Sequence, residues 1–120
     1  MAEFKIIFYK KEDKTSPVQL FIDSLDDKMS SKVTQNIEIL KRFGTALREP
    51  YTKSLGDGIF ELRTKAGSDI TRVLYFFVVG RKIVLTNGFI KKTQKTPRQE
   101  IETAKKYRFD YLNRTKDKKE

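Results

Sequence analysis

The stretch from Ile70 to Val79, Ile-Thr-Arg-Val-Leu-Tyr-Phe-Phe-Val-Val, decides the fold that this sequence predicts. It is a nearly continuous run of β-branched and aromatic residues, which favours a buried central strand. Gly80-Arg81 follows directly and predicts a tight turn into a further strand over Ile83–Phe89. Before it, Ile59–Lys65 alternates apolar with charged residues, which is typical of a strand with one buried and one polar face. Together the three strands predict an antiparallel meander.

The first half of the chain predicts one strand and two helices. Glu3–Lys10 is rich in aromatic and β-branched residues and stops at a run of charges, so we expect a strand there. Ser16-Pro17-Val18-Gln19 combines an N-cap, a proline for the first helical position and a glutamine three residues after the cap. Asp26 or Asp27 can cap a second helix that ends at Gly44. The apolar stripes are Val18, Phe21, Ile22 and Leu25 in the first helix and Met29, Val33, Ile37 and Leu40 in the second. We expect these stripes to cover the sheet.

The other segments are interpreted as a connector, a last helix and a tail. Residues 45–58 contain Pro50 and the turn dipeptide Asp57-Gly58, which indicate a connector. Thr96-Pro97, as N-cap and first helical position, predicts the start of a C-terminal helix. Residues 114–120 hold no apolar residue, so we expect a disordered tail after a single domain over residues 1–113.

Composition limits the chemistry available to this chain of 120 residues. It has 26 lysines and arginines against 16 acidic residues, a net charge of +10, and neither histidine nor cysteine. The absence of cysteine excludes a disulfide or a thiolate nucleophile, and the usual general base is missing as well. Any proton transfer near neutral pH must therefore use Lys, Arg, Tyr, Asp or Glu. The positive charge favours a polyanion or an acidic protein as partner, and no apolar run is long enough for a membrane span.

A basic segment joins the last strand to the last helix. Phe89–Glu100 reads Phe-Ile-Lys-Lys-Thr-Gln-Lys-Thr-Pro-Arg-Gln-Glu and places Lys91, Lys92 and Lys95 before the helix start. Free backbone N–H groups and the helix dipole at such a start favour bound anions. The alternative is an ordinary solvated connector.

Arg72 stands in the most apolar strand, where an unpaired buried charge is costly. Alternation places it on the same face as Leu74 and Phe76, and Arg63 lies on the neighbouring strand of the meander. The arginines and the basic loop can then converge on one site. The alternative is a structural salt bridge between Arg72 and Glu61. Unless that pair forms closely, we expect Arg72→Ala to abolish activity and to change stability by no more than about 1 kcal/mol.

Three runs carry a family resemblance, namely Leu55 to Arg63, Arg72 to Phe76, and Leu85 through Lys95-Thr96-Pro97 to Ala104. They resemble HigB-type toxins of the RelE/ParE superfamily, in its phage-derived branch. The resemblance implies a RelE-like α+β fold with a four-stranded, mainly antiparallel sheet, two N-terminal helices and a C-terminal helix. It further implies a cytoplasmic bacterial type II toxin that enters the ribosomal A site and cleaves mRNA without metal or cofactor. A helix-turn-helix antitoxin of the HigA type is the implied partner.

The resemblance also assigns roles by position. Arg63, Arg72 and Lys92 are implied as catalytic residues that stabilise the phosphate and move protons while the ribose 2′-hydroxyl attacks. The residues expected to bind RNA are Lys65, Lys91, Lys95 and Arg98. Adjacent residues at a strand exit point to opposite sides, so Lys91→Ala is expected to be milder than Lys92→Ala. The identities of the general acid and the general base stay open.

Two other classes of function also stay open. One is the gyrase-poisoning branch of the same superfamily, which would be marked by loss of the cationic cluster. The other is a nucleic-acid-binding module whose lysines contact phosphates without chemistry. Translation arrest with recovered mRNA fragments separates both classes from an endoribonuclease.

Overall fold

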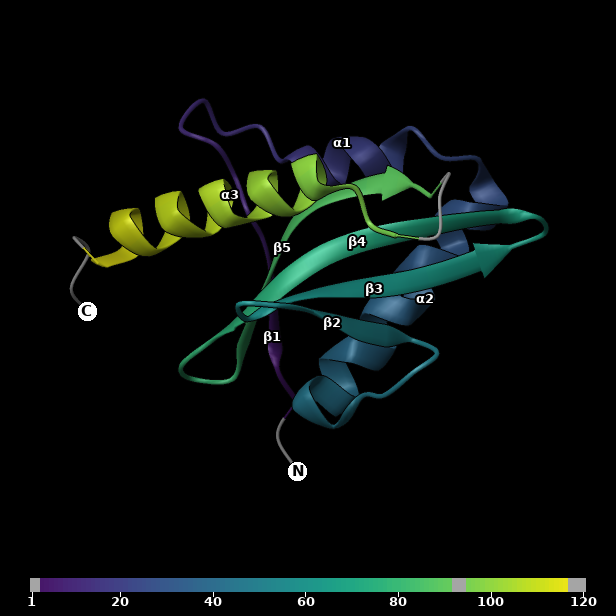
Figure 1. Cartoon of the computed structure of the whole chain (residues 1–120), viewed down its shortest axis with the longest axis horizontal. Helices are drawn as coiled ribbons and strands as arrows, with labels where there is room; N and C mark the ends of the chain where they lie inside the picture. Colours follow the sequence, from purple (N-terminus) through teal and green to yellow (C-terminus); the bar gives the residue numbers. More distant parts are fainter. Residues whose placement is uncertain (1–2, 92–94, 117–120) are drawn as a thin grey trace.

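The computed structural model describes residues 3–91 and 95–116 of the chain. Within these ranges, five strands form one sheet in the order β1-β5-β4-β3-β2, with α3 on one face and α1 and α2 on the other (Figure 1). The elements are β1 (Lys5–Phe8), α1 (Pro17–Asp23), α2 (Asp27–Phe43), a 3-10 turn (Gly44–Ala46), β2 (Thr52–Gly56), β3 (Ile59–Ala66), β4 (Asp69–Val78), β5 (Lys82–Ile90) and α3 (Arg98–Lys116). Strands β2 to β5 form an antiparallel meander, and β1 pairs with β5 in parallel. The predicted α+β class is confirmed.

The sheet has one strand more than the four that the sequence predicted. Strand β2 lies in the segment that was interpreted as a connector, and it pairs with β3 through the two-residue turn Asp57-Gly58. Both turn residues have positive φ angles, 54° and 79°, as the tightest hairpin turns require. Of the five residues of β2, only Thr52 is buried. The segment therefore lacks the apolar alternation from which a strand is recognised.

The two N-terminal helices begin at the predicted caps, and α2 ends at Gly44 as predicted. Helix α1 ends at Asp23, so Leu25, which was expected to extend its apolar stripe, lies after the helix. The Ser16 hydroxyl accepts the backbone N–H of Gln19 at 3.2 Å, and the Asp26 carboxylate accepts that of Met29 at 2.8 Å. Helix α2 ends at Gly44, whose φ is +50° and where a Cβ would lie 2.0 Å from the Phe4 ring. The core on this face is formed by Val18, Met29, Val33 and Leu40 of the helices against Leu62, Val73, Tyr75 and Leu85 of the sheet.

Helix α3 covers the opposite face of the sheet. Ala104 is fully buried, and the second core beneath α3 includes Ile59, Leu74, Phe76 and Val84. Because this helix and the residues before it lie across β3 and β4, Glu61 of β3 is 0 % exposed. The strand was predicted to have one buried and one polar face, and on the polar face Glu61 is buried as well.

The C-terminal end of α3 is held against the chain that follows β1. The Tyr9 hydroxyl donates to Asp110 Oδ2 at 2.5 Å, and Arg114 donates to the same oxygen from Nε at 3.0 Å and from Nη2 at 2.6 Å. Arg114 Nη2 also donates to the carbonyl oxygen of Lys10. Helix α3 therefore includes residues 114–116, and the predicted start of a disordered tail at residue 114 was wrong. Residues 117–120 lie outside the described part of the chain.

Tyr9 should make stability fall at alkaline pH. Burial and the hydrogen bond to the Asp110 carboxylate raise the pKa of Tyr9 from 10.0 to about 12. A raised folded-state pKa gives stability that is complete below the unfolded-state pKa and is lost as pH rises through the folded-state value. We expect wild type to lose stability between about pH 10 and about pH 12 more steeply than Tyr9→Phe, in urea unfolding curves.

Tyr51→Phe is the matched control for this experiment, because Tyr51 is exposed. It should keep the wild-type slope over the same pH range. Parallel curves for wild type and Tyr9→Phe would show that the Tyr9–Asp110 contact does not contribute to alkaline stability.

Candidate functional site

Four basic residues converge on one carboxylate on the α3 face of the sheet, near the N-terminal end of that helix. We call Lys53, Arg63, Arg72 and Lys91 the cationic cluster, and its central carboxylate is Glu61. Strand pairing places the cluster together, since Lys53 lies opposite Glu61 and Arg63 lies opposite Arg72. The Lys91 N–H donates to a β4 backbone carbonyl at 2.7 Å, which continues the β4–β5 pairing one residue past β5.

The centre of the cluster is a buried ion pair. Glu61 is 0 % exposed and Arg72 is 1 % exposed, and Arg72 Nη1 lies 2.5 Å from Glu61 Oε2. Arg63 Nε lies 3.6 Å from the same oxygen. The salt bridge that the sequence left as an alternative role for Arg72 is therefore present. A buried pair of this kind depends on additional hydrogen bonds to offset the cost of removing both charges from water.

Thr96 supplies such hydrogen bonds, from the segment before α3. Its hydroxyl donates to Glu61 Oε1 and accepts from Arg72 Nη1 at 3.0 Å. The first carbonyl to accept helical N–H groups is that of Pro97, so α3 begins one residue later than predicted. The Thr96 hydroxyl therefore forms a hydrogen bond with each member of the buried ion pair. A hydrogen bond to an ionised carboxylate is stronger than one to a neutral acceptor.

Two nitrogens of the Arg72 guanidinium have no hydrogen-bond acceptor in the described part of the chain. Its Nε and Nη2 atoms are buried there without a hydrogen-bond partner. Asn87 of β5, which pairs with Leu74, donates to the Glu100 backbone carbonyl at 3.2 Å and to the Glu100 carboxylate at 3.0 Å, which fixes the first turn of α3 against the sheet. Unsatisfied buried guanidinium donors are costly, so these two nitrogens call for an acceptor that the described residues do not supply.

The environment of Lys91 changes its acidity. Partial removal from water and then the positive charges of Arg72 and Arg63 lower the pKa of Lys91, while Glu61 acts in the opposite direction. A lower pKa increases the neutral fraction of the amine, which is the form that can accept a proton. The sequence assigned Lys91 to RNA binding with a mild effect. The structure places it within the cluster.

The other sequence-predicted residues fall into three groups. Lys92, predicted to be catalytic, lies outside the described residues. Lys65 is exposed on β3 and pairs with Ile70. Because the Ile70 carbonyl oxygen accepts the Lys91 N–H, Lys65 lies at the same end of the strands as Lys91. Lys95 and Arg98 are exposed before and at the start of α3.

Sequence reasoning missed two members of the site. Lys53 lies on β2, which was not predicted, and no local pattern sets it apart from the other lysines. Thr96 was interpreted only as a helix cap. Its capping position and its place after a basic run were visible, but its contact with Glu61 depends on how α3 crosses the sheet.

Two general properties of the described residues bear on partners. No helix in residues 3–91 and 95–116 is both long and apolar enough to cross a membrane. Over the same residues, no three acidic side chains gather in a group that could hold a metal ion.

The fold and the cluster define a small basic α+β protein with an anion-binding candidate site. The family model described as Phage derived protein Gp49-like (DUF891) matches residues 20–108, from α1 into α3. The chain therefore belongs to the Gp49-like family of phage-derived proteins, which is part of the RelE/HigB-like toxin superfamily and is associated with toxins of toxin–antitoxin systems. No curated protein matches the chain significantly. The predicted superfamily is confirmed, and the HigB type stays a prediction.

Proposed function

We propose that this chain is the toxin of a type II toxin–antitoxin system and an endoribonuclease that cleaves mRNA on the ribosome. The observation that carries the proposal is the convergence of Arg63, Arg72 and Lys91 with the lowered pKa of Lys91. Such a cluster suits the attack of a ribose 2′-hydroxyl on the adjacent phosphate. That reaction needs a base, an acid and charge stabilisation, and no step of it requires an added cofactor.

Each step of the reaction has a group in the cluster. Neutral Lys91 takes the proton of the 2′-hydroxyl, and the resulting oxygen bonds to phosphorus as the bond to the 5′-oxygen breaks. Arg63, which is partly exposed beside Glu61, stabilises the charge that develops on the phosphate oxygens. Protonated Lys53, the second lysine of the cluster, donates a proton to the departing 5′-oxygen. The products are a 2′,3′-cyclic phosphate and a 5′-hydroxyl.

The proposed partners follow from charge and family. A net charge of +10 suits both the ribosomal A site with its mRNA and an acidic segment of an antitoxin. We assign neutralisation to a helix-turn-helix antitoxin of the HigA type, encoded beside this chain and acting in the cytoplasm. Association with either partner should weaken as salt rises.

A toxin that poisons gyrase without cleaving RNA is the second candidate. It ranks second because its mark would be loss of the cationic cluster, which is present. The observation on its side is that Arg72, 1 % exposed and ion-paired with Glu61, has a role in the fold whether or not a phosphate binds. Under this function Arg63 and Lys91 would contact a partner surface without taking part in chemistry.

The test is the chemistry of the cut ends. The protein is treated with EDTA, dialysed, and added to purified ribosomes programmed with labelled mRNA in magnesium buffer. We expect cleavage in the A site that leaves a 2′,3′-cyclic phosphate or its opened product, at the rate of untreated protein. Fragments with a 3′-hydroxyl, or activity lost with the chelated metal, would contradict the mechanism. Growth arrest with intact mRNA and trapped gyrase–DNA complexes would favour the second candidate.

A further inference from the structure

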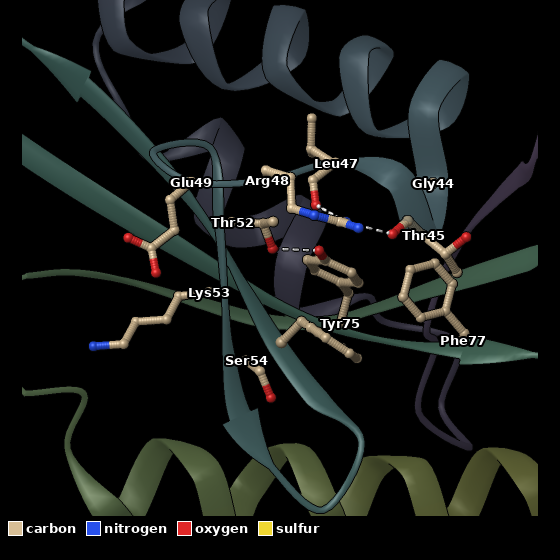
Figure 2. A pocket seen from close by; sticks show the side chains of 11 residues that line it. Gly44, Thr45, Leu47, Arg48, Glu49, Thr52, Lys53, Ser54, Tyr75 and Phe77 are labelled. Atoms are coloured by element: carbon tan, nitrogen blue, oxygen red, sulfur yellow. Dashed lines mark hydrogen bonds between the residues drawn. The ribbon is translucent and has the colours of Figure 1, made fainter.

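A pocket of about 310 Å³ lies on the opposite face of the sheet from the cationic cluster. Helix α2 covers this face only as far as Gly44, and beyond its end Phe60, Tyr75 and Phe77 are left as an aromatic wall (Figure 2). The rings of Phe60 and Tyr75 are stacked at 5.5 Å, and Phe77 meets them edge-on at 5.4 and 5.7 Å. Aromatic rings fixed against one another in this way offer a rigid surface for a planar ligand.

The polar groups of the pocket have a defined direction. The Thr52 hydroxyl donates to the Glu61 carbonyl oxygen at 3.0 Å, so Tyr75 must be the donor in the 2.5 Å hydrogen bond between the two hydroxyls (Figure 2). Burial raises the pKa of Tyr75, which keeps that hydroxyl protonated. Tyr75 itself is 1 % exposed, so the ring surface that the pocket offers to a ligand comes from the partly exposed Phe60 and Phe77, which Tyr75 holds in place.

One basic and one acidic residue, Arg48 and Glu49, flank the mouth of the pocket. Lys53 also borders the pocket from strand β2, but its pairing with Glu61 places its side chain on the face of the cationic cluster. Arg48 is held at the mouth, because its Nη1 donates to the carbonyl oxygens of Thr45 at 3.0 Å and Leu47 at 3.2 Å. An anchored guanidinium beside an aromatic wall suits a ligand with a flat ring and an attached anion.

We propose that this pocket binds one nucleobase of a single-stranded RNA, with the base against the aromatic wall and the adjoining phosphate at Arg48. Every base has a π-face and at least one edge with a polar group, and stacking on aromatic side chains is a general mode of single-strand binding. A pocket near the lower limit of ligand-site volumes fits one base with its ribose. The site would be a second RNA contact, because the sheet separates its aromatic wall from Glu61, Arg63 and Arg72.

The test uses nucleoside monophosphates as probes, followed by backbone amide resonances. We expect saturable shifts at Thr52, Tyr75 and Ser54 with at least one of AMP, GMP, CMP and UMP, and no such shifts with ribose 5-phosphate. Arg48→Glu should weaken binding by at least about fivefold, since it reverses the charge at the phosphate position. Arg42→Glu is the matched control, because Arg42 is exposed in the last turn of α2 and does not line the pocket.

Three results would overturn the proposal. They are equal binding of ribose 5-phosphate, tighter binding of N-acetyltyrosinamide than of any nucleotide, which would indicate docking of a protein side chain, and no saturable shift at the pocket. The pocket and the proposed cleavage are tested separately, since Lys91→Met leaves the pocket unchanged and should bind the nucleotides as wild type does.

Discussion

Glu61→Gln is expected to lower the free energy of unfolding by about 3 kcal/mol, because it leaves a buried guanidinium without its counter-ion. Glutamine keeps the volume of the side chain and one oxygen acceptor, so the change removes charge more than shape. The charge matters at this position, since Glu61 is 0 % exposed and its carboxylate lies 2.5 Å from Arg72 and 3.6 Å from Arg63. Urea unfolding at neutral pH measures the effect.

Two further variants identify the cause of the loss. Asp57→Asn makes the same chemical change at an exposed carboxylate 2.9 Å from Lys105, and it should leave the unfolding curve near that of wild type. The double variant Glu61→Met with Arg72→Met removes both charges and should recover most of the stability that Glu61→Gln loses. Wild-type stability for Glu61→Gln would mean that the Glu61–Arg72 contact is not an ion pair in solution.

This ion pair also changes what is expected of Arg72→Ala. The sequence-based prediction that stability changes by no more than about 1 kcal/mol assumed that Arg72 forms no close ion pair with Glu61. With the pair present, Arg72→Ala leaves Glu61 as a buried carboxylate, so we expect a loss comparable to that of Glu61→Gln. Loss of toxicity in that variant alone therefore does not identify Arg72 as a catalytic group.

The strand and helix pattern was largely readable from local chemistry. The caps at Ser16 and Asp26, the end of α2 at Gly44 and the turn at Gly80-Arg81 each rest on a few adjacent residues, and the structure has all of them. Strand β2 was not readable, because pairing with β3 stabilises it and its own side chains are mostly exposed. Elements that depend on a partner strand leave little trace in their own sequence.

The candidate site was predicted in part for the same reason. Alternation along single strands is local, and it placed Arg63 and Arg72 together as neighbours. The contacts of Thr96 with Glu61 and the approach of Lys91 to the arginines depend on the crossing of α3 and on the exact exit of β5. Lys92 was assigned as the catalytic lysine by the family resemblance, and strand alternation made Lys91 the milder position. Lys92 lies outside the described residues, so its role stays a prediction.

Lys91→Met is expected to slow single-turnover cleavage on programmed ribosomes by at least about a hundredfold, the usual contribution of a positioned general base. Methionine keeps the apolar stem of the side chain, and no carboxylate in the described part of the chain forms a salt bridge with Lys91, so the thermal midpoint should stay near that of wild type. Arg63→Met should slow cleavage to a similar extent, through lost charge stabilisation. Lys28→Met, at an exposed position on α2, is the control and should cut as wild type does.

The pH dependence of cleavage tests the role assigned to Lys91. The pKa of its amine is lowered from 10.5 by partial burial and by Arg72 and Arg63, so the neutral base becomes available at lower pH than in a free lysine. The wild-type rate should therefore rise with pH above neutrality and level off above the lowered pKa of Lys91. Lys91→Met should remove this rise and leave a slow, nearly flat profile. If the variant kept the wild-type slope, the base would be another group, and Lys92→Met would be the next variant to measure.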